Sequence, residues 1–336
     1  MKRKQFLSSL LGTGLLPAMA GHDEDFQQSI VSPPALKKGD TIGIISPAGY
    51  ITLEELQPAI SQMEAWGFTI KTGNAIGKKD FSLGGTDKER SRDFQQMLED
   101  PAVKAIMCAR GGYGSVRIID NINFSRLADR PKWIIGFSDI TVLHCHINSN
   151  IRVATLHSKM CNSFPKDPAA AEQIQLQTIA SIRDALTGTK MKYTATFNER
   201  NRTGVTEATL IGGNLKTIET LSGTKSEIRT AGKILFLEDT GEYLYSLDRM
   251  LWNLKRTNKL SQLKGLIIGG FRIKPDDPGE EFGRTLYDIV MEKVQEYSYP
   301  VCFDFPVGHQ KNNYALKCGV LHRLSVTKNN TELIEI

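Results

Sequence analysis

Short apolar runs alternate with amphipathic stretches through the first half of the chain. Residues 41–49 have the pattern of a buried strand that ends in a turn, and residues 54–66 place apolar side chains on one helical face. The same two patterns recur as strands at 68–72, 102–109 and 132–137, a helix at 87–98 and a helix that begins at Val116. This alternation predicts an α/β domain over residues 37–165, with a mostly parallel sheet and helices on both faces. The strand at 132–137 runs into Ser138 and Asp139, which we expect to cap the next helix.

The pattern changes after residue 165. Residues 166–204 are hydrophilic apart from a helix predicted near residues 170–186, and we interpret them as the connection between two domains. Residues 205–336 are richer in turns and predict a mixed, strand-rich C-terminal domain. Its predicted strands are residues 233–237, 263–268 and 324–327, and its predicted helices are residues 215–221 and 246–254.

The first twenty residues have the order of an export signal. A basic start at residues 2–4 precedes a moderately apolar run over 7–17 and a small-x-small cleavage site at 18–20. That run is too short to anchor the chain in a bilayer, so we expect an exported, periplasmic protein without a stable membrane anchor. Residues 21–36 are polar and then proline-rich, which predicts a linker. If the segment is instead a frayed amphipathic end, the protein is cytoplasmic.

Composition narrows the class of protein. A length of 336 residues, of which 40% are hydrophobic, predicts a globular chain of two domains. Removal of residues 1–20 takes away three cations and no acids, so the formal charge falls from +5 to +2, and the body shows no Lys/Arg cluster. This pattern excludes nucleic acid as a partner. Five cysteines at irregular spacing, without a C-x-x-C pair, predict no zinc site, and we expect no metal and no cofactor.

The glycine-rich segment at residues 110–117 is the strongest chemical signal. A strand leads into Gly111-Gly112-Tyr113-Gly114, a tight turn in which glycine is sterically favoured, and Ser115 opens the next helix. Such a serine lies at the carboxyl edge of the sheet, beside the free N–H groups of a helix N-terminus. This is the arrangement of a nucleophile elbow, although the sequence differs from the G-x-S-x-G motif.

Three other interpretations of this segment stay open. Ser115 can be a simple N-cap, the loop can hold a phosphate, or the glycines can serve only to form the turn. The segment lacks the lysine of the phosphate-binding P-loop, which argues against the interpretation as a phosphate-binding loop.

A nucleophilic serine needs a base, normally a histidine oriented by a carboxylate. Among six histidines, His309 lies on a polar loop directly after a predicted strand, where functional residues concentrate. We interpret His157 as structural or exposed. Glu238 and Asp239 stand where an apolar strand ends, and a carboxylate there needs a partner, so one of them is a candidate. A plain turn at the end of the strand is the alternative.

Six segments in order along the chain resemble the LD-carboxypeptidase family, which also contains microcin-immunity peptidases. These segments are residues 38–49, 83–90, 110–117, 135–141, 237–251 and 306–309, and residues 210–215 fit as well. The resemblance runs from about residue 38 to 320 and covers nearly the whole mature chain. It implies Ser115 as the nucleophile, His309 as general base and then acid, and Glu238 as the residue that orients the imidazole. The N-terminal domain would supply the serine and the C-terminal domain its two partners.

The resemblance also implies the reaction of a serine-type carboxypeptidase. The substrate would be a small peptide, a peptidoglycan-derived tetrapeptide (muropeptide), from which an acyl-enzyme mechanism releases the terminal D-Ala. We expect the oxyanion to accept from the backbone N–H of Val116 and, as a second donor, of Gly85. Arg110 or Arg117 is a candidate for the substrate carboxylate. The family pattern further suggests a homodimer, and its best-known members act in the cytoplasm, whereas this chain carries an export-like segment.

Two other functions remain as alternatives. The chain can be a microcin-immunity-type peptidase that cleaves peptidyl-nucleotide antibiotics, or a catalytically inactive ligand-binding relative. An aromatic side chain beside the pocket would favour the first, and labelling of Ser115 by an activated serine probe would eliminate the second.

Overall fold

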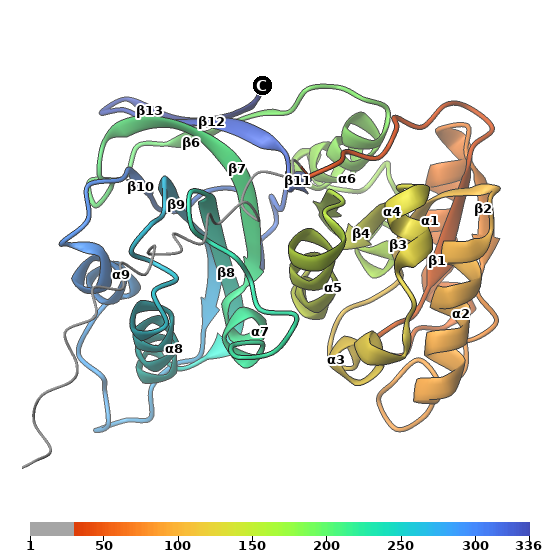
Figure 1. Cartoon of the computed structure of the whole chain (residues 1–336), viewed down its shortest axis with the longest axis horizontal. Coiled ribbons are helices and arrows are strands. Elements are labelled where there is room, and N and C mark those ends of the chain that lie inside the picture. Colours follow the sequence, from red (N-terminus) through yellow and green to blue (C-terminus); the bar gives the residue numbers. More distant parts are fainter. Residues whose placement is uncertain (1–29) are drawn as a thin grey trace, which may run out of the picture.

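The computed structural model describes residues 30–336 and has two α/β halves side by side, each built on one sheet (Figure 1). The first sheet has the strand order β11-β5-β4-β3-β1-β2, and its strands pair in parallel except for β11, which comes from the far end of the chain. Its strands are β1 (Thr41–Ile45), β2 (Thr69–Thr72), β3 (Val103–Cys108), β4 (Trp133–Gly136), β5 (Thr155–His157) and β11 (Leu316–Cys318).

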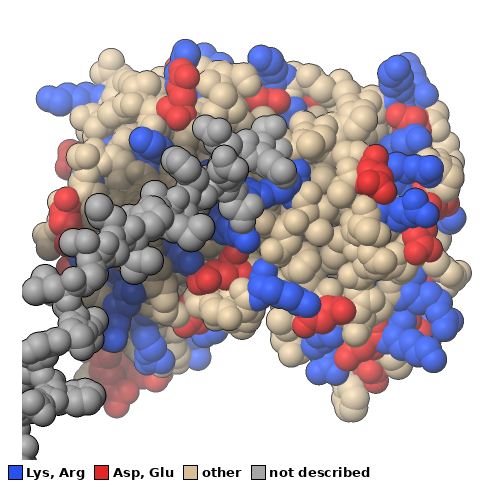
Figure 2. All heavy atoms as spheres, in the orientation of Figure 1, with Lys and Arg blue, Asp and Glu red and all other residues tan. Residues whose placement is uncertain are grey.

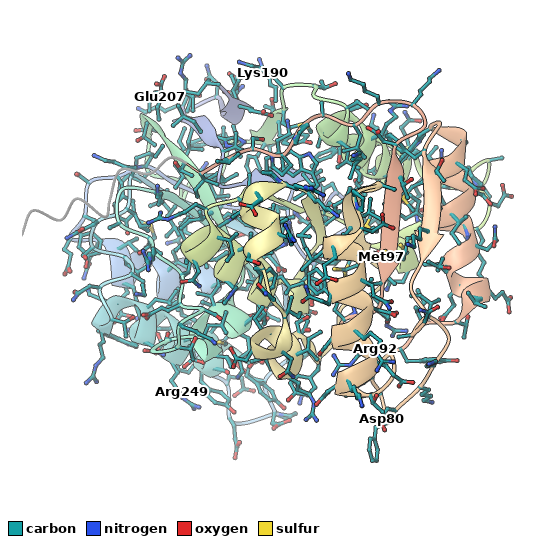
Figure 3. All side chains as sticks on the ribbon, turned by 45° about the vertical axis from the view of Figure 1, so that its right-hand side comes forward. Asp80, Arg92, Met97, Lys190, Glu207 and Arg249 are labelled. Atoms are coloured by element: carbon teal, nitrogen blue, oxygen red, sulfur yellow. The ribbon has the colours of Figure 1, made fainter. Side chains whose placement is uncertain are left out.

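Helices cover the first sheet. They are α1 (Leu53–Ala65), α2 (Asp87–Glu99), α3 (Ser115–Ile118), α4 (Ser125–Asp129), α5 (Thr141–His146) and α6 (Gln173–Leu186). Thr52 and Thr86 begin α1 and α2 with capping boxes. Each threonine hydroxyl accepts from the N–H of the glutamate three residues later, and the carboxylate of that glutamate accepts from the backbone N–H of the threonine. On α2, Met97 is buried under the sheet while Arg92 is exposed to solvent (Figure 3).

The second sheet is mixed, with the order β10-β9-β8-β7-β12-β13-β6. β7 to β10 pair in parallel, and β12, β13 and β6 continue the sheet with antiparallel pairs. Its strands are β6 (Lys192–Thr196), β7 (Gly204–Asn214), β8 (Ile234–Glu242), β9 (Gly265–Ile273), β10 (Val301–Cys302), β12 (Leu321–Val326) and β13 (Asn330–Glu335). Its helices are α7 (Leu215–Thr220), α8 (Leu244–Arg256) and α9 (Leu286–Val294).

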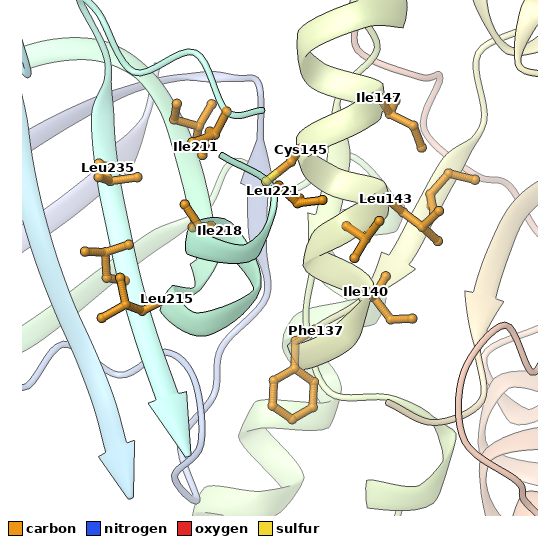
Figure 4. Packing of buried hydrophobic residues seen from close by; sticks show 14 of the residues in the cluster. Phe137, Ile140, Leu143, Cys145, Ile147, Ile211, Leu215, Ile218, Leu221 and Leu235 are labelled. Atoms are coloured by element: carbon orange, nitrogen blue, oxygen red, sulfur yellow. The ribbon is translucent and has the colours of Figure 1, made fainter. Parts of the chain in front are cut away.

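This architecture confirms the predicted fold class, a mostly parallel N-terminal α/β sheet followed by a mixed, strand-rich half. The two halves share one apolar cluster, in which α5 packs on α7 and β7 (Figure 4). Leu143 and Cys145 of α5 belong to the same buried cluster as Ile211 of β7 and Ile218 of α7. The boundary between the halves is therefore a packed interface, and residues at the strand ends on both sides of it are held at fixed positions.

All five cysteines are buried and none is bonded to another. Burial raises the pKa of every one of these thiols, because the apolar interior disfavours the thiolate. Within residues 30–336 no group of three or more His, Cys, Asp or Glu side chains gathers in a way that would hold a metal ion.

Charged side chains are interspersed by sign over the face shown in Figure 2. In the part of the chain that the structure describes, no helix is long and apolar enough to cross a membrane. The predicted export signal at residues 1–20 lies outside the described residues.

Candidate functional site

The turn that carries Ser115 is shaped by glycines. Gly112 and Gly114 have φ angles of +103° and +139°, which L side chains rarely adopt. A Cβ on Gly114 would lie 2.8 Å from Nη1 of Arg90 and 3.2 Å from Cα of Ala48, so only glycine fits there. The turn delivers the chain from β3 into α3, and Ser115 is the first residue of that helix and fully buried.

One guanidinium braces this turn from inside. Arg90 of α2 is 1% exposed, and its Nη1 donates to the carbonyl oxygens of Gly114, at 3.0 Å, and of Pro47. Its Nε donates to the carbonyl of Gly85 at 3.2 Å, and its Nη2 pairs with Asp87. The same side chain thus ties the Gly84–Gly85 turn to the serine turn, because five fixed donors let one arginine bind several carbonyls.

Asp139 holds the first N–H of α3. Its Oδ2 accepts from the backbone N–H of Ser115 at 2.8 Å, and burial raises the pKa of the Asp139 carboxyl although this N–H opposes the rise. Our expectation that Ser138 and Asp139 cap their own helix is wrong: Phe137 occupies the N-cap position there, and the carboxylate reaches across to α3 instead. The hydroxyl of Ser115 has no hydrogen-bond partner among the described residues.

Glu238 and His309 form a direct pair. Oε2 of Glu238 lies 2.5 Å from Nδ1 of His309, and the carboxylate is fully buried while the ring is 14% exposed. Glu238 lies where the pairing of β8 with β9 shifts register between Leu237 and Asp239, and such bulges turn a side chain out of the regular alternation. Burial by itself raises the pKa of Glu238, but the hydrogen bond to His309 and the two nearby imidazoles, His309 and His157, outweigh it and hold the pKa below its usual value.

The loop before His309 approaches Glu238 through a glycine. Gly308 has φ +96°, and a Cβ there would lie 2.3 Å from Cβ of Glu238, so a larger residue would push the pair apart. The N–H of Gly308 donates to Oδ1 of Asn313 at 2.7 Å, and the N–H of Gly270 in β9 donates to the carbonyl of Val307 at 2.7 Å. The loop is therefore fixed on both sides of the imidazole.

The segment at residues 137–139 lies between the serine turn and the histidine loop. The Phe137 ring packs on the His309 ring with centroids 5.0 Å apart, and the Asp139 carboxylate accepts from the N–H of Ser115. A second link joins the halves where the N–H of Asn214 donates to Oγ1 of Thr141 at 3.0 Å. The structure thus brings Glu238 and His309 together directly and borders them with the segment that holds Ser115.

A cavity of about 370 Å³ opens between the halves beside this segment. Tyr113, Val116 and Asp139 line it from the first half, and Asn214, Lys216, Asp239 and Glu242 are among the residues that line it from the second. Burial raises the pKa of Asp239 to about 6, although that carboxylate accepts from the N–H groups of Thr240 and Lys216 and from the Asn214 amide. The cavity offers carboxylates and one lysine, so both signs of charge are within reach of a bound molecule.

Two candidate residues named from the sequence have other contacts here. Arg117 makes two hydrogen bonds to Asp87, at 3.0 and 2.8 Å, whereas Arg110 is exposed and donates to the carbonyl of Tyr50 at 3.3 Å. Sequence reasoning missed His157, which is buried with Nε2 3.9 Å from Oε1 of Glu238. Its position at the carboxyl end of a buried strand was the available signal.

Comparison with known proteins identifies the family. Residues 42–158 match the LD-carboxypeptidase N-terminal domain and residues 207–324 match the LD-carboxypeptidase C-terminal domain. The chain is 33% identical over 305 residues to the Bacillus subtilis (strain 168) protein named "Probable murein peptide carboxypeptidase", covering 90% of this chain and 94% of that one. It is 30% identical to the murein tetrapeptide carboxypeptidase of Pseudomonas aeruginosa, covering 83% of this chain and 91% of that protein.

Solved structures agree in fold. The muramoyltetrapeptide carboxypeptidase from Oxalobacter formigenes superposes with a TM-score of 0.78 at 27% identity, covering 88% of this chain and 99% of that one. The microcin C7 self-immunity protein MccF superposes with a TM-score of 0.79 at 25% identity, covering 90% of this chain and 98% of that one; MccF from Escherichia coli is 26% identical over 332 residues, covering 89% of this chain and 94% of that protein. With both domains matched and a relative of 33% identity aligned over nearly its full length, this chain belongs to the LD-carboxypeptidase family.

Proposed function

We propose that this protein is a serine-type LD-carboxypeptidase that releases the terminal D-Ala from peptidoglycan-derived tetrapeptides. The observation that carries the proposal is the buried Glu238–His309 pair. With Nδ1–H donating to Oε2 of Glu238, the imidazole keeps Nε2 as a base, next to the segment that holds Ser115.

The proposed chemistry divides hydrolysis into two acyl transfers. Oγ of Ser115 attacks the carbonyl carbon of the scissile bond while Nε2 of His309 takes its proton, and the imidazolium then protonates the leaving amine of D-Ala. Water next attacks the acyl-enzyme by the same route, and the acid product leaves with the serine restored. Glu238 stays ionised throughout, because its pKa is held below the usual value, and it stabilises the imidazolium.

Backbone N–H groups would bind the oxyanion in both steps. We propose the N–H of Val116, which follows the nucleophile and lines the interdomain cavity, and the N–H of Gly85 as the second donor. The Arg90 bridge between the two turns supports the second choice, because it fixes Gly85 relative to Gly114. Each such donor contributes about 3–4 kcal/mol of barrier lowering in comparable sites.

The cavity supports a zwitterionic peptide as substrate. Carboxylates of Asp139, Asp239 and Glu242 together with the ammonium of Lys216 match a peptide end that carries both amino and carboxyl groups. Arg117 is occupied by Asp87, so we keep Arg110 as the arginine candidate for the substrate carboxylate. We also propose that the chain acts as an exported, periplasmic protein and as a homodimer, which fractionation and sedimentation would test.

The direct test is incubation of the purified protein with muropeptide tetrapeptide and mass spectrometry of the products. We expect loss of one D-Ala. Ser115→Ala removes the nucleophile, and we expect turnover to fall by about 10⁴- to 10⁶-fold with an unchanged circular dichroism spectrum and melting temperature. Near wild-type turnover in Ser115→Ala would refute the assignment of the nucleophile.

One observation favours a second candidate function, the cleavage of peptidyl-nucleotides. Tyr113 lines the cavity and is 55% exposed, so its ring is free to stack on a base. The structural relative MccF has been solved in complex with aspartyl sulfamoyl adenosine. Rates measured for the same sample on a peptidyl-nucleotide and on the muropeptide decide between the two functions. We expect the muropeptide to be cleaved faster.

A further inference from the structure

A buried histidine outside the proposed triad lies against the carboxylate of that triad. His157 ends β5, at the carboxyl edge of the first sheet, and it is fully buried. Its Nε2 lies 3.9 Å from Oε1 of Glu238, the oxygen that does not accept from His309. The contact joins the two halves of the molecule, because Glu238 belongs to β8 of the second sheet.

Three atoms at this contact have no hydrogen-bond partner among the described residues: Oε1 of Glu238 and the two ring nitrogens of His157. Buried polar atoms in native proteins are nearly always paired, so orphans that face each other at a functional site require an explanation. A separation of 3.9 Å is too long for a hydrogen bond, but a movement of about 1 Å by the two side chains would close it. Catalytic hydrogen bonds commonly tighten in this way when substrate binds.

Three aromatic rings lie around His157. The rings of Phe236 and Phe137 meet it edge-on, with centroids 4.9 and 5.8 Å away, and the His144 ring lies at 6.1 Å. Nε2 of His144 donates to the carbonyl of Gly136 at 2.9 Å, and burial lowers the pKa of His144 to about 3, so that ring stays neutral. Glu238 is therefore the charged group that His157 faces.

Two further charged groups act on Glu238. Lys159 donates to the carbonyl of Gln310 at 2.8 Å and attracts the carboxylate, and Asp239, the next residue on β8, repels it. Neither makes a hydrogen bond to Oε1, so these charges change the electrostatic potential at the Glu238 carboxylate but do not fix its orientation.

We propose that His157 is a positioning residue: as the Nε2–H tautomer it donates to Oε1 of Glu238 and holds the carboxylate with Oε2 directed at Nδ1 of His309. The inference rests on the proposed function, in which Glu238 orients the base. A carboxylate fixed at both oxygens cannot rotate away when His309 becomes an imidazolium, and the donor comes from the half that carries Ser115. Alignment of the base is thereby coupled to the contact between the two sheets.

Two substitutions separate positioning from packing. His157→Leu removes the donor and keeps an apolar side chain, while His157→Gln keeps an N–H donor of similar reach. We expect His157→Leu to lower kcat on the tetrapeptide by about 10- to 100-fold with KM nearly unchanged, and His157→Gln to restore most of the loss. Loss of the donor makes Glu238 more basic, so the acid limb of kcat/KM should move to higher pH by about half a unit or more in His157→Leu.

A second readout needs no turnover. In ¹⁵N-histidine-labelled protein, the ring signal of His309, assigned with His309→Gln, should titrate at higher pH in His157→Leu than in the wild type. His322→Leu is the matched control, because His322 is also a buried histidine but lies in β12 and bonds the carbonyl of Val320. We expect that control to lower stability without moving the His309 titration.

Several results would overturn the proposal. These are a His309 titration in His157→Leu that matches the wild type, activity that falls only with the folded fraction, or His157→Gln no better than His157→Leu. A wild-type protein that cleaves no tetrapeptide would refute the proposed function alone, because the titration still measures whether His157 acts on the Glu238–His309 pair.

Discussion

The serine turn and the Glu238–His309 pair are ordered by different means. Around Ser115 it is the main chain that is held in place. Glycines adopt positive φ angles, a buried guanidinium donates to three carbonyls, and one carboxylate accepts from the first N–H of the helix. The pair instead depends on two side chains that are 71 residues apart in sequence and meet at 2.5 Å. The first region is stiff because of main-chain constraints, and the second is ordered because each side chain is the other's partner.

This difference predicts which substitutions harm chemistry and which harm the fold. A change in the pair should remove a hydrogen bond needed for catalysis while the sheets remain packed. A change in the turn should first cost stability, because the chain cannot take another path there.

Within the Glu238–His309 pair, the largest expected effect comes from Glu238→Gln. The amide has the shape of the carboxylate but cannot stabilise an imidazolium, and it permits the wrong imidazole tautomer, so kcat should fall by about 10⁴-fold. Steady-state kinetics on the tetrapeptide measure this, and the melting temperature should change little. Glu207→Gln, an exposed glutamate on β7 that pairs with Arg323, is the control and should keep wild-type kcat. Equal activity in both variants would remove Glu238 from the mechanism.

An intermediate effect is expected from Gly114→Ala. The added Cβ meets Arg90, Leu83 and Ala48 within 3.2 Å, and the φ of +139° is strained as well, so the free energy of unfolding should fall by about 3 kcal/mol. The matched control is Gly232→Ala, at φ +72° with no atom within 4 Å of the new Cβ, which should cost only about 1 kcal/mol. Urea denaturation gives both values. Equal losses would show that the close packing of the turn contributes nothing.

The smallest effect concerns the pH dependence of stability. The pKa of Asp239 rises from 3.8 to about 6 on folding, so the folded state binds this proton more tightly than the unfolded chain. The resulting stabilisation is complete below pH 3.8 and is lost as pH rises through about 6, which amounts to about 2–3 kcal/mol. Relative to Asp239→Asn, which cannot titrate, the wild type should therefore lose free energy of unfolding between pH 4 and pH 6.5. Parallel pH profiles for the two proteins would contradict the raised pKa.

Much of the fold could be predicted because its signals are local. The helix predicted at 87–98 is observed at Asp87–Glu99, since the Thr86–Glu89 capping box and the apolar spacing both lie within the segment. The glycine turn before Ser115 was predictable for the same reason. The join of β11 to the first sheet was not, because three residues near the end of the chain carry no sign of a partner 160 residues earlier.

The residues of the site could be predicted only in part. The pairing of Glu238 with His309 came from family resemblance and is present in the structure, whereas the residues alone left Asp239 as an equal candidate. Asp239 binds the start of α7, and the two acids stand where the pairing of β8 with β9 shifts register, which no spacing within the sequence reveals. His157 was overlooked because its significance lies in a contact across two sheets, which no spacing within the sequence encodes.

The unbonded, buried cysteines have a consequence for where the protein can work. Since no cross-link has to form, the chain reaches the same folded state in a reducing cytosol and in an oxidising envelope compartment. With their thiolates disfavoured, the five sulfurs are also poor targets for peroxide or for mispairing with the thiols of other proteins. The fold of residues 30–336 therefore places no redox requirement on the compartment in which the protein works.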